Sequence, residues 1–202
     1  MPAFVIYING WPGVGKLTVA RALQRLIPGS QLLHNHEMID PVEARYPRGS
    51  AKYKIKRGEY RRSRLKPIQE DSSLRHTVYI FTDSQTQWNE CISDYTSLAH
   101  GGHARRFYTV ILHCDAEENE RRLQSPGRGQ DSRGKLTDVK MLREYRNGEG
   151  IYKFRDDDEI EVDVTDVDAK DAAGVICEFV AKREREGRSG MTWEEGGYDY
   201  DY

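Results

Sequence analysis

Residues 4–18 read FVIYINGWPGVGKLT, and this stretch decides the fold of the chain. Residues 4–8 form a continuous apolar run, which is typical of a strand buried on both faces of a parallel sheet. A glycine-rich turn follows, and apolar residues then recur at helical spacing over residues 19–27. The order of strand, glycine loop and helix is the context in which Gly-x4-Gly-Lys binds phosphate. The stretch therefore predicts a phosphate loop between the first strand and the first helix.

The chemistry of this loop depends on its glycines and its lysine. Glycine allows backbone conformations closed to other residues, so successive N–H groups can point at one anion. The helix that begins near Lys16 adds its positive dipole end, and the Lys16 ammonium can reach the outer phosphates. The residue after the lysine usually carries a hydroxyl that binds Mg²⁺, but here Leu17 stands first and Thr18 follows. The alternative is a glycine-rich turn that binds no ligand.

The rest of the chain alternates strands with helices. Further strands are expected at residues 31–33, 77–81, 107–112 and 160–164. Helices are expected within the basic segment 49–74, around residues 88–95, after residue 115, at 137–146 and at 172–180. This alternation predicts an α/β fold with a parallel sheet and right-handed crossovers.

Composition bounds the remaining possibilities. With 202 residues, 37% of them hydrophobic, the chain is expected to form one domain with one core. The formal charge of −2 gives no general attraction to nucleic acid or to an anionic membrane. No apolar run approaches the roughly 18 residues of a membrane span, and no signal peptide is expected. Three scattered cysteines without a CxxC pair indicate reduced thiols and a cytoplasmic location.

The loop also carries a family resemblance. GWPGVGKLT resembles the GxPGxGKGT loop of adenylate kinases and related small-molecule kinases, in which the hydroxyl also comes second after the lysine. Over residues 3–182 the chain is similar to the P-loop kinases of the P-loop nucleoside triphosphate hydrolase superfamily. That group includes AAA-type, gluconate-kinase-like, shikimate-kinase-like and chloramphenicol-phosphotransferase-like enzymes.

The resemblance implies a fold and a division of the chain. The fold would be a three-layer α/β sandwich with a five-stranded parallel sheet in the order 2-3-1-4-5. Residues 1–187 would form a single domain, with an acceptor-binding insertion at 36–74 and a lid at 125–135. Residues 188–202 are expected to be a flexible acidic tail.

The resemblance further implies ATP and Mg²⁺ as ligands. The loop would hold ATP through Gly10, Pro12, Gly13, Val14, Gly15, Lys16, Leu17 and Thr18. Thr18 and Asp83 would orient Mg²⁺ through water. Asp83 follows a buried strand, at the edge where open α/β sheets bind their ligands. The alternative is that Asp83 caps the next helix.

Arginines near the expected lid could serve the transferred phosphoryl group. Arg122 and Arg128 resemble the lid pair of P-loop kinases, and Arg133 is a third candidate. A guanidinium can match phosphoryl oxygens with two hydrogen bonds. The alternative is a solvated loop whose arginines face water.

The acceptor region begins after the second strand, at LHNHEMIDPVE (residues 33–43). Related kinases often place an aspartate there as general base, but Asn35 or His36 stands at that position in this chain. His36 could accept a proton, since the pKa of histidine lies near operating pH. Asp40, one helical turn on, could serve instead or orient the acceptor. Alternatively, His36 satisfies backbone groups at the strand end.

A basic segment follows in the same insertion. Arg61, Arg62 and Arg64 could hold an anionic or phosphorylated acceptor, or they could form a solvated helix face. The segment has too few stacking aromatics for a nucleic-acid groove, so no nucleic-acid partner is expected.

These features predict an ATP-dependent phosphotransferase that moves the γ-phosphoryl group to a hydroxyl or phosphate of a small molecule. The rival from another class is a nucleotide-dependent ATPase or switch that phosphorylates nothing. No NKxD-like guanine reader and no helical lid domain after the core are found, which favours the kinase. A nucleic-acid end kinase is a third alternative. The sequence identifies neither the acceptor nor the oligomeric state.

Overall fold

The structure is a computed structural model, and it describes residues 3–100, 103–126, 136–148 and 150–189. The strands are β1 (Phe4–Gly10), β2 (Gln31–His34), β3 (Tyr79–Thr82), β4 (Arg106–His113) and β5 (Glu159–Asp163). The α-helices are α1 (Lys16–Leu26), α2 (Asn35–Glu43), α3 (Tyr53–Glu70), α4 (Glu90–His100), α5 (Ala116–Leu123), α6 (Val139–Arg146) and α7 (Ala169–Ser189). A short 3₁₀ turn, η1 (Ser72–Leu74), follows α3.

The five strands form one parallel sheet in the order β2-β3-β1-β4-β5. This confirms the predicted fold class and strand order. Strand β1 lies in the middle, with Ile8 opposite Thr82 of β3 on one side and Val110 of β4 on the other. The carboxyl ends of β1, β2 and β3 therefore meet at one edge of the sheet, which is where a doubly wound sheet binds its ligands.

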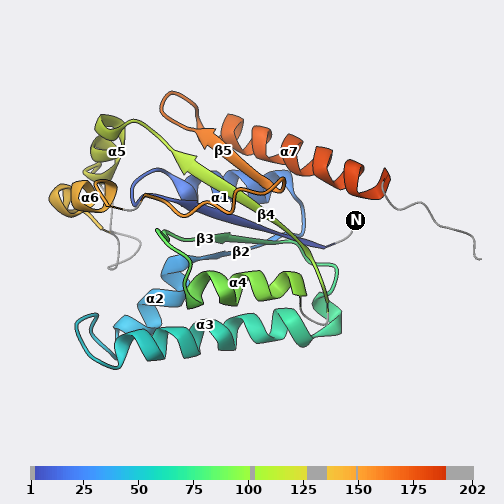
Figure 1. Cartoon of the computed structure of the whole chain (residues 1–202), viewed down its shortest axis with the longest axis horizontal. Helices are drawn as coiled ribbons and strands as arrows, with labels where there is room; N and C mark the ends of the chain where they lie inside the picture. The colour runs from blue at the N-terminus through green and yellow to red at the C-terminus, as the bar shows by residue number, and fades with distance from the viewer. Residues whose placement is uncertain (1–2, 101–102, 127–135, 149, 190–202) are drawn as a thin grey trace, which may run out of the picture.

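Helices cover both faces of this sheet (Figure 1), with α1 and α7 on one face and α2, α3 and α4 on the other. Strand β1 is buried along its whole length, and its side chains alternate between the two faces. Phe4, Ile6 and Ile8 pack with α1 and α7, whereas Val5 and Tyr7 pack with α3 and α4. The apolar run of β1 is thus the shared centre of two hydrophobic layers.

Some boundaries differ from those expected. The acceptor segment begins with a regular helix, α2, and continues into the longer α3. Helix α4 begins at Glu90, so Trp88 lies before it with 53% of its surface exposed, because Asn89 caps that helix through its side chain. Helix α7 extends to Ser189, and the remainder of the predicted tail lies outside the described residues.

A buried ion pair ties α3 to α4. Arg61 is 5% exposed, and its Nε and Nη2 donate to Asp94 Oδ2 at 2.8 and 2.6 Å. This contact joins α3 to α4 on the face of the sheet that also carries α2. Within the described part of the chain, no helix is both long enough and apolar enough to cross a membrane.

Candidate functional site

The loop between β1 and α1 adopts the conformation that its glycines allow. Gly13 has φ +93° and Gly15 has φ +107°, which lie in the left-handed region. Gly15 stands directly before the first turn of α1, and its carbonyl accepts the N–H of Val19 at 3.0 Å. The backbone thus wraps around the amino-terminal end of α1, as an anion-binding loop requires.

Helices α5 and α6 support this loop from behind. Asn119 of α5 is fully buried, and its Nδ2 donates to the carbonyl of Pro12 at 2.9 Å. Its Oδ1 accepts from Arg146 of α6 at 2.9 Å. A Cβ added at Gly13 would lie 2.7 Å from Asn119 Nδ2. Gly13 is therefore fixed both by its φ and by the close approach of α5.

We expect Gly13→Ala to lower both stability and nucleotide binding. A non-glycine residue at this φ costs on the order of 1–3 kcal/mol, and the added methyl group displaces Asn119 from the loop. Thermal unfolding and titration with a fluorescent ATP analogue measure the two effects. The control is Gly174→Ala in α7, where an added Cβ meets no atom within 4 Å. Equal stability and affinity of the two variants would contradict this account.

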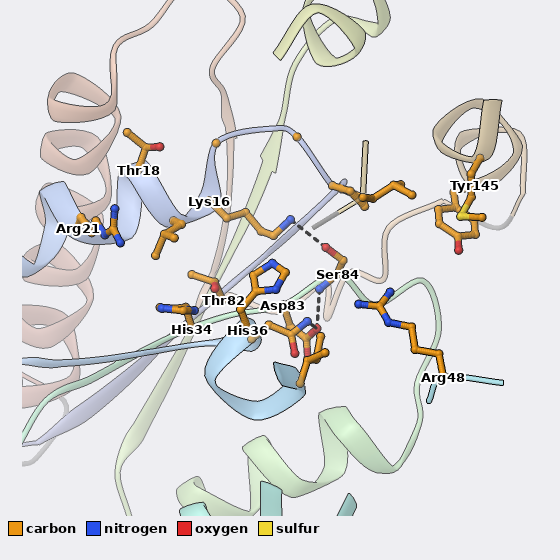
Figure 2. Close-up of a pocket in the computed structure, with 18 residues that line it drawn as sticks. Lys16, Thr18, Arg21, His34, His36, Arg48, Thr82, Asp83, Ser84 and Tyr145 are labelled. Atoms are coloured by element: carbon orange, nitrogen blue, oxygen red, sulfur yellow. Dashed lines mark hydrogen bonds between the residues drawn. The ribbon is translucent and has the colours of Figure 1, made fainter. Parts of the chain in front are cut away.

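Lys16 is the first residue of α1, directly after the loop. Its Nζ donates to the carbonyls of Gly10 and Trp11 at 2.7 and 2.8 Å and to Ser84 Oγ at 2.9 Å. Figure 2 shows this side chain crossing from α1 toward Ser84, which follows the end of β3. The lysine therefore joins the phosphate loop to the neighbouring strand end.

Asp83 is held at the same strand end by three donors. It is 1% exposed; its Oδ1 accepts from the Ser84 N–H and from Asn35 Nδ2, each at 2.7 Å. Its Oδ2 accepts the thiol of Cys91 at 3.0 Å. The first N–H groups of α4 are bound by Asn89 instead. Asp83 is therefore not the cap of α4.

The Asp83 contacts include residues that sequence reasoning missed. Burial raises the pKa of the Cys91 thiol well above its usual range, and the nearby Asp83 carboxylate raises it further, so the thiol stays protonated and donates. Asn35 accepts from Arg57 Nη2 at 3.0 Å while donating to Asp83, which links α3 to the site. No local sequence signal marks the contacts of Asn35 with Arg57 and with Asp83, because the paired residues are 22 and 48 positions apart in the chain.

A cavity of about 340 Å³ opens in front of these residues. Its lining includes much of the predicted nucleotide loop, namely Pro12, Gly13, Gly15, Lys16, Leu17 and Thr18. Gly10 and Val14 belong to the loop but do not line the cavity. Thr82 at the end of β3 and the two residues after it, Asp83 and Ser84, also line the cavity.

The acceptor segment contributes a second wall. His34, Asn35 and His36 line the cavity, and the His36 ring points into it, toward Lys16 (Figure 2). His36 Nδ1 lies 3.6 Å from Asp40 Oδ1, and Asp40 itself does not line the cavity. The structure thus brings His36 to the phosphate loop and places Asp40 behind it.

The predicted lid arginines fall into two groups. Arg128 and Arg133 lie outside the described residues. Arg122 belongs to α5, and its guanidinium donates to the carbonyls of Val14, Val164 and Thr165 at 3.1, 2.6 and 3.0 Å. It does not line the cavity. Arg122 thus braces the back of the phosphate loop, and its contact with phosphate stays a prediction.

The basic residues of α3 lie away from the cavity. Arg61 pairs with Asp94, and neither Arg62 nor Arg64 is among the lining residues. Two other arginines line it instead: Arg21 of α1 and Arg48 of the segment between α2 and α3. Arg21 comes four residues after Leu17 on the same helix face, a spacing that could have revealed it.

Comparison with known proteins agrees with this arrangement. The model of a family described as AAA domain matches residues 6–145, which is more than half of the chain. A search of the curated proteins finds no match. A gluconokinase from Sinorhizobium meliloti 1021 is similar in structure, with a TM-score of 0.65 and 13% identity, over 95% of this chain and 98% of that one.

Two further solved structures share the fold. An APS kinase of Mycobacterium tuberculosis, solved with AMPPNP and APS, has a TM-score of 0.57 and 15% identity over 89% of this chain and 98% of its own. A tunicamycin resistance protein of Deinococcus radiodurans has a TM-score of 0.58 and 20% identity, over 88% of this chain and 95% of its own. The likeness confirms the P-loop kinase fold, and the chain belongs to the AAA domain family.

Proposed function

We propose that this chain is an ATP-dependent kinase that transfers the γ-phosphoryl group to a hydroxyl or phosphate of a small molecule. One observation carries the proposal: a single cavity is lined by the phosphate loop with Lys16, by Asp83 and by His36. A nucleotide and an acceptor bound there would meet within one cavity. The kinase fold of the solved relatives supports the same reading.

The residues of the cavity fit a bound Mg²⁺. This ion prefers oxygen ligands and keeps several waters, so one carboxylate and one hydroxyl beside phosphate oxygens suffice. Asp83 and Thr18 both line the cavity, and they supply one carboxylate and one hydroxyl. We propose that they orient the ion, largely through its waters. The bound ion would neutralise charge on the phosphates during transfer.

His36 is the proposed proton acceptor for an acceptor hydroxyl. Its ring enters the cavity, and the Asp40 carboxylate lies 3.6 Å from Nδ1 on the side away from the lining. Lys16 and the loop N–H groups would hold the transferred phosphoryl group. Catalysis in such a site comes mostly from positioning and from electrostatic stabilisation.

Leu17→Ser tests the interpretation of the shifted hydroxyl. Leu17 lines the cavity but has no group that can bind phosphate or Mg²⁺, so its replacement removes no ligand contact. We expect the Kd for Mg·ATP to stay within about threefold of wild type. Equilibrium titration of both proteins measures this. If nucleotide binds only after the substitution, Leu17 marks a decayed site and the proposal fails.

The acceptor class can be tested by ADP production in the presence of different additions. We expect a protein-free extract of small molecules to stimulate ADP release from Mg·ATP, because transfer needs an acceptor. Short oligonucleotides serve as the second arm and should give no stimulation. Stimulation by oligonucleotides that falls steeply with salt would instead favour a nucleic-acid end kinase.

A further inference from the structure

Another wall of the cavity is made by two separate segments. Arg48 comes from the segment between α2 and α3, and Tyr145 comes from α6. Figure 2 shows both side chains entering the cavity on the side opposite α1. This wall lies outside the groups assigned above to nucleotide and proton transfer, so it can distinguish one acceptor from another.

Arg48 supplies positive charge to this wall. Its Nε contacts Glu43 Oε1 at 2.9 Å, which fixes the side chain, and Figure 2 shows the guanidinium directed toward Ser84. Asp83 is the only carboxylate among the described lining residues, and Asn35, Ser84 and Cys91 already donate to it. Glu43 offsets part of the Arg48 charge, but the described lining still carries three cations, Lys16, Arg21 and Arg48, against the single carboxylate of Asp83. The cavity therefore favours an anion, and a guanidinium matches a carboxylate or a phosphate with two hydrogen bonds.

Helix α6 supplies an apolar surface beside Arg48. Met141 and Tyr145 are one helical turn apart, line the cavity and are 40% and 47% exposed. Leu142, on the other side of α6, is fully buried in a cluster with Trp11 and Leu123. Leu142 thus anchors one face of α6 in the core, and the other face presents Met141 and Tyr145 to the cavity. A flat or apolar ligand body would remove this surface from water.

We propose that the acceptor is an amphipathic anion: Arg48 binds its carboxylate or phosphate, and Met141 and Tyr145 pack against an apolar or aromatic body. This specifies the substrate class of the proposed kinase site and rests on that function. A polyol without an apolar face leaves Met141 and Tyr145 uncovered. The assignment also moves the anion-binding role from the α3 arginines to Arg48, which lines the cavity.

The test uses small probes while the nucleotide site is filled with Mg·AMPPNP. Phenyl phosphate carries both features, inorganic phosphate only the charge, and benzyl alcohol only the ring. Phenylacetate replaces the phosphate by a carboxylate. Ligand-observed NMR titration gives each Kd. We expect at least one of phenyl phosphate and phenylacetate to bind about tenfold more tightly than inorganic phosphate and benzyl alcohol, and the tighter of the two identifies the anion.

Matched variants assign the binding to this wall. Arg48→Ala should weaken binding of the tighter aromatic anion about tenfold and leave benzyl alcohol unchanged, and Arg48→Lys should retain part of the affinity. Tyr145→Ala should reduce binding to the level of inorganic phosphate, whereas Tyr145→Phe keeps the ring and should bind normally. Arg45→Ala is the control, because Arg45 is exposed in the same segment and does not line the cavity.

Two results would overturn the proposal. One is that neither phenyl phosphate nor phenylacetate binds better than inorganic phosphate to the wild-type protein. The other is equal binding by Arg48→Ala and Arg45→Ala, with normal thermal unfolding of both. Failure of the proposed kinase function looks different: Mg·AMPPNP itself would not bind to the wild-type chain.

Discussion

Replacing Lys16 with alanine is expected to abolish measurable ATP binding and to lower turnover about a thousandfold. The Lys16 ammonium lies at the amino-terminal end of α1 and contacts Gly10, Trp11 and Ser84 at 2.7 to 2.9 Å. No other cation of the described residues occupies this loop, so the variant loses the point charge that would face the outer phosphates. Removing one such preorganised group commonly lowers the catalytic rate by a factor of about 10²–10³.

Calorimetric titration with Mg·ATP and steady-state rates measure this loss. Lys182→Ala is the matched control, because the Lys182 side chain is 68% exposed on α7. Its one ion pair among the described residues is with Glu186, at 3.8 Å. Both variants should unfold near the wild-type temperature. Wild-type affinity in Lys16→Ala would show that this loop is not the nucleotide site.

Asp94→Ala is expected to produce the largest loss of stability. Arg61 is 5% exposed, and both of its contacts end on Asp94 Oδ2. The substitution would leave a buried guanidinium without its carboxylate, which costs about 3–5 kcal/mol of the free energy of unfolding. Because α3 also carries Arg57, which contacts Asn35, we expect the damage to reach Asn35 in the lining of the cavity.

Urea unfolding followed by circular dichroism gives the free energy of unfolding. The control is Glu70→Ala, which breaks an exposed pair with Lys66 on α3 and should change stability by about 0–1 kcal/mol. A loss below about 1 kcal/mol in Asp94→Ala would mean that solvent reaches Arg61 and that the pair does not hold α3 to α4.

The central fold follows from local patterns. The run from Phe4 to Ile8, the glycine spacing and the helical period after Lys16 each act over a few residues, so the sequence alone reveals the strand, the loop and the helix. Asp83 was recognisable for the same reason, since it directly follows a buried strand. Strand order came from the family resemblance, because local patterns do not specify which strands are neighbours.

The cavity wall formed by Arg48 and Tyr145 could not be predicted in the same way. Arg48 lies in an irregular segment, and Tyr145 lies nearly a hundred residues later, so only the folded chain brings them to one cavity. Arg61 looked like a ligand-binding residue because arginine suits anions, but long-range packing against Asp94 decides its position. Arg122 stands at the expected place in the chain, and its direction depends on the carbonyls of Val164 and Thr165.

The most direct test of the proposed kinase follows the γ-phosphorus of ATP. The wild-type chain is incubated with γ-labelled ATP, Mg²⁺ and a protein-free extract of small molecules, and the products are separated chromatographically. We predict that the label enters an organic phosphate, and that Lys16→Ala leaves it in ATP. Label that appears only as inorganic phosphate, at the same rate with and without the extract, would contradict the kinase and indicate an ATPase.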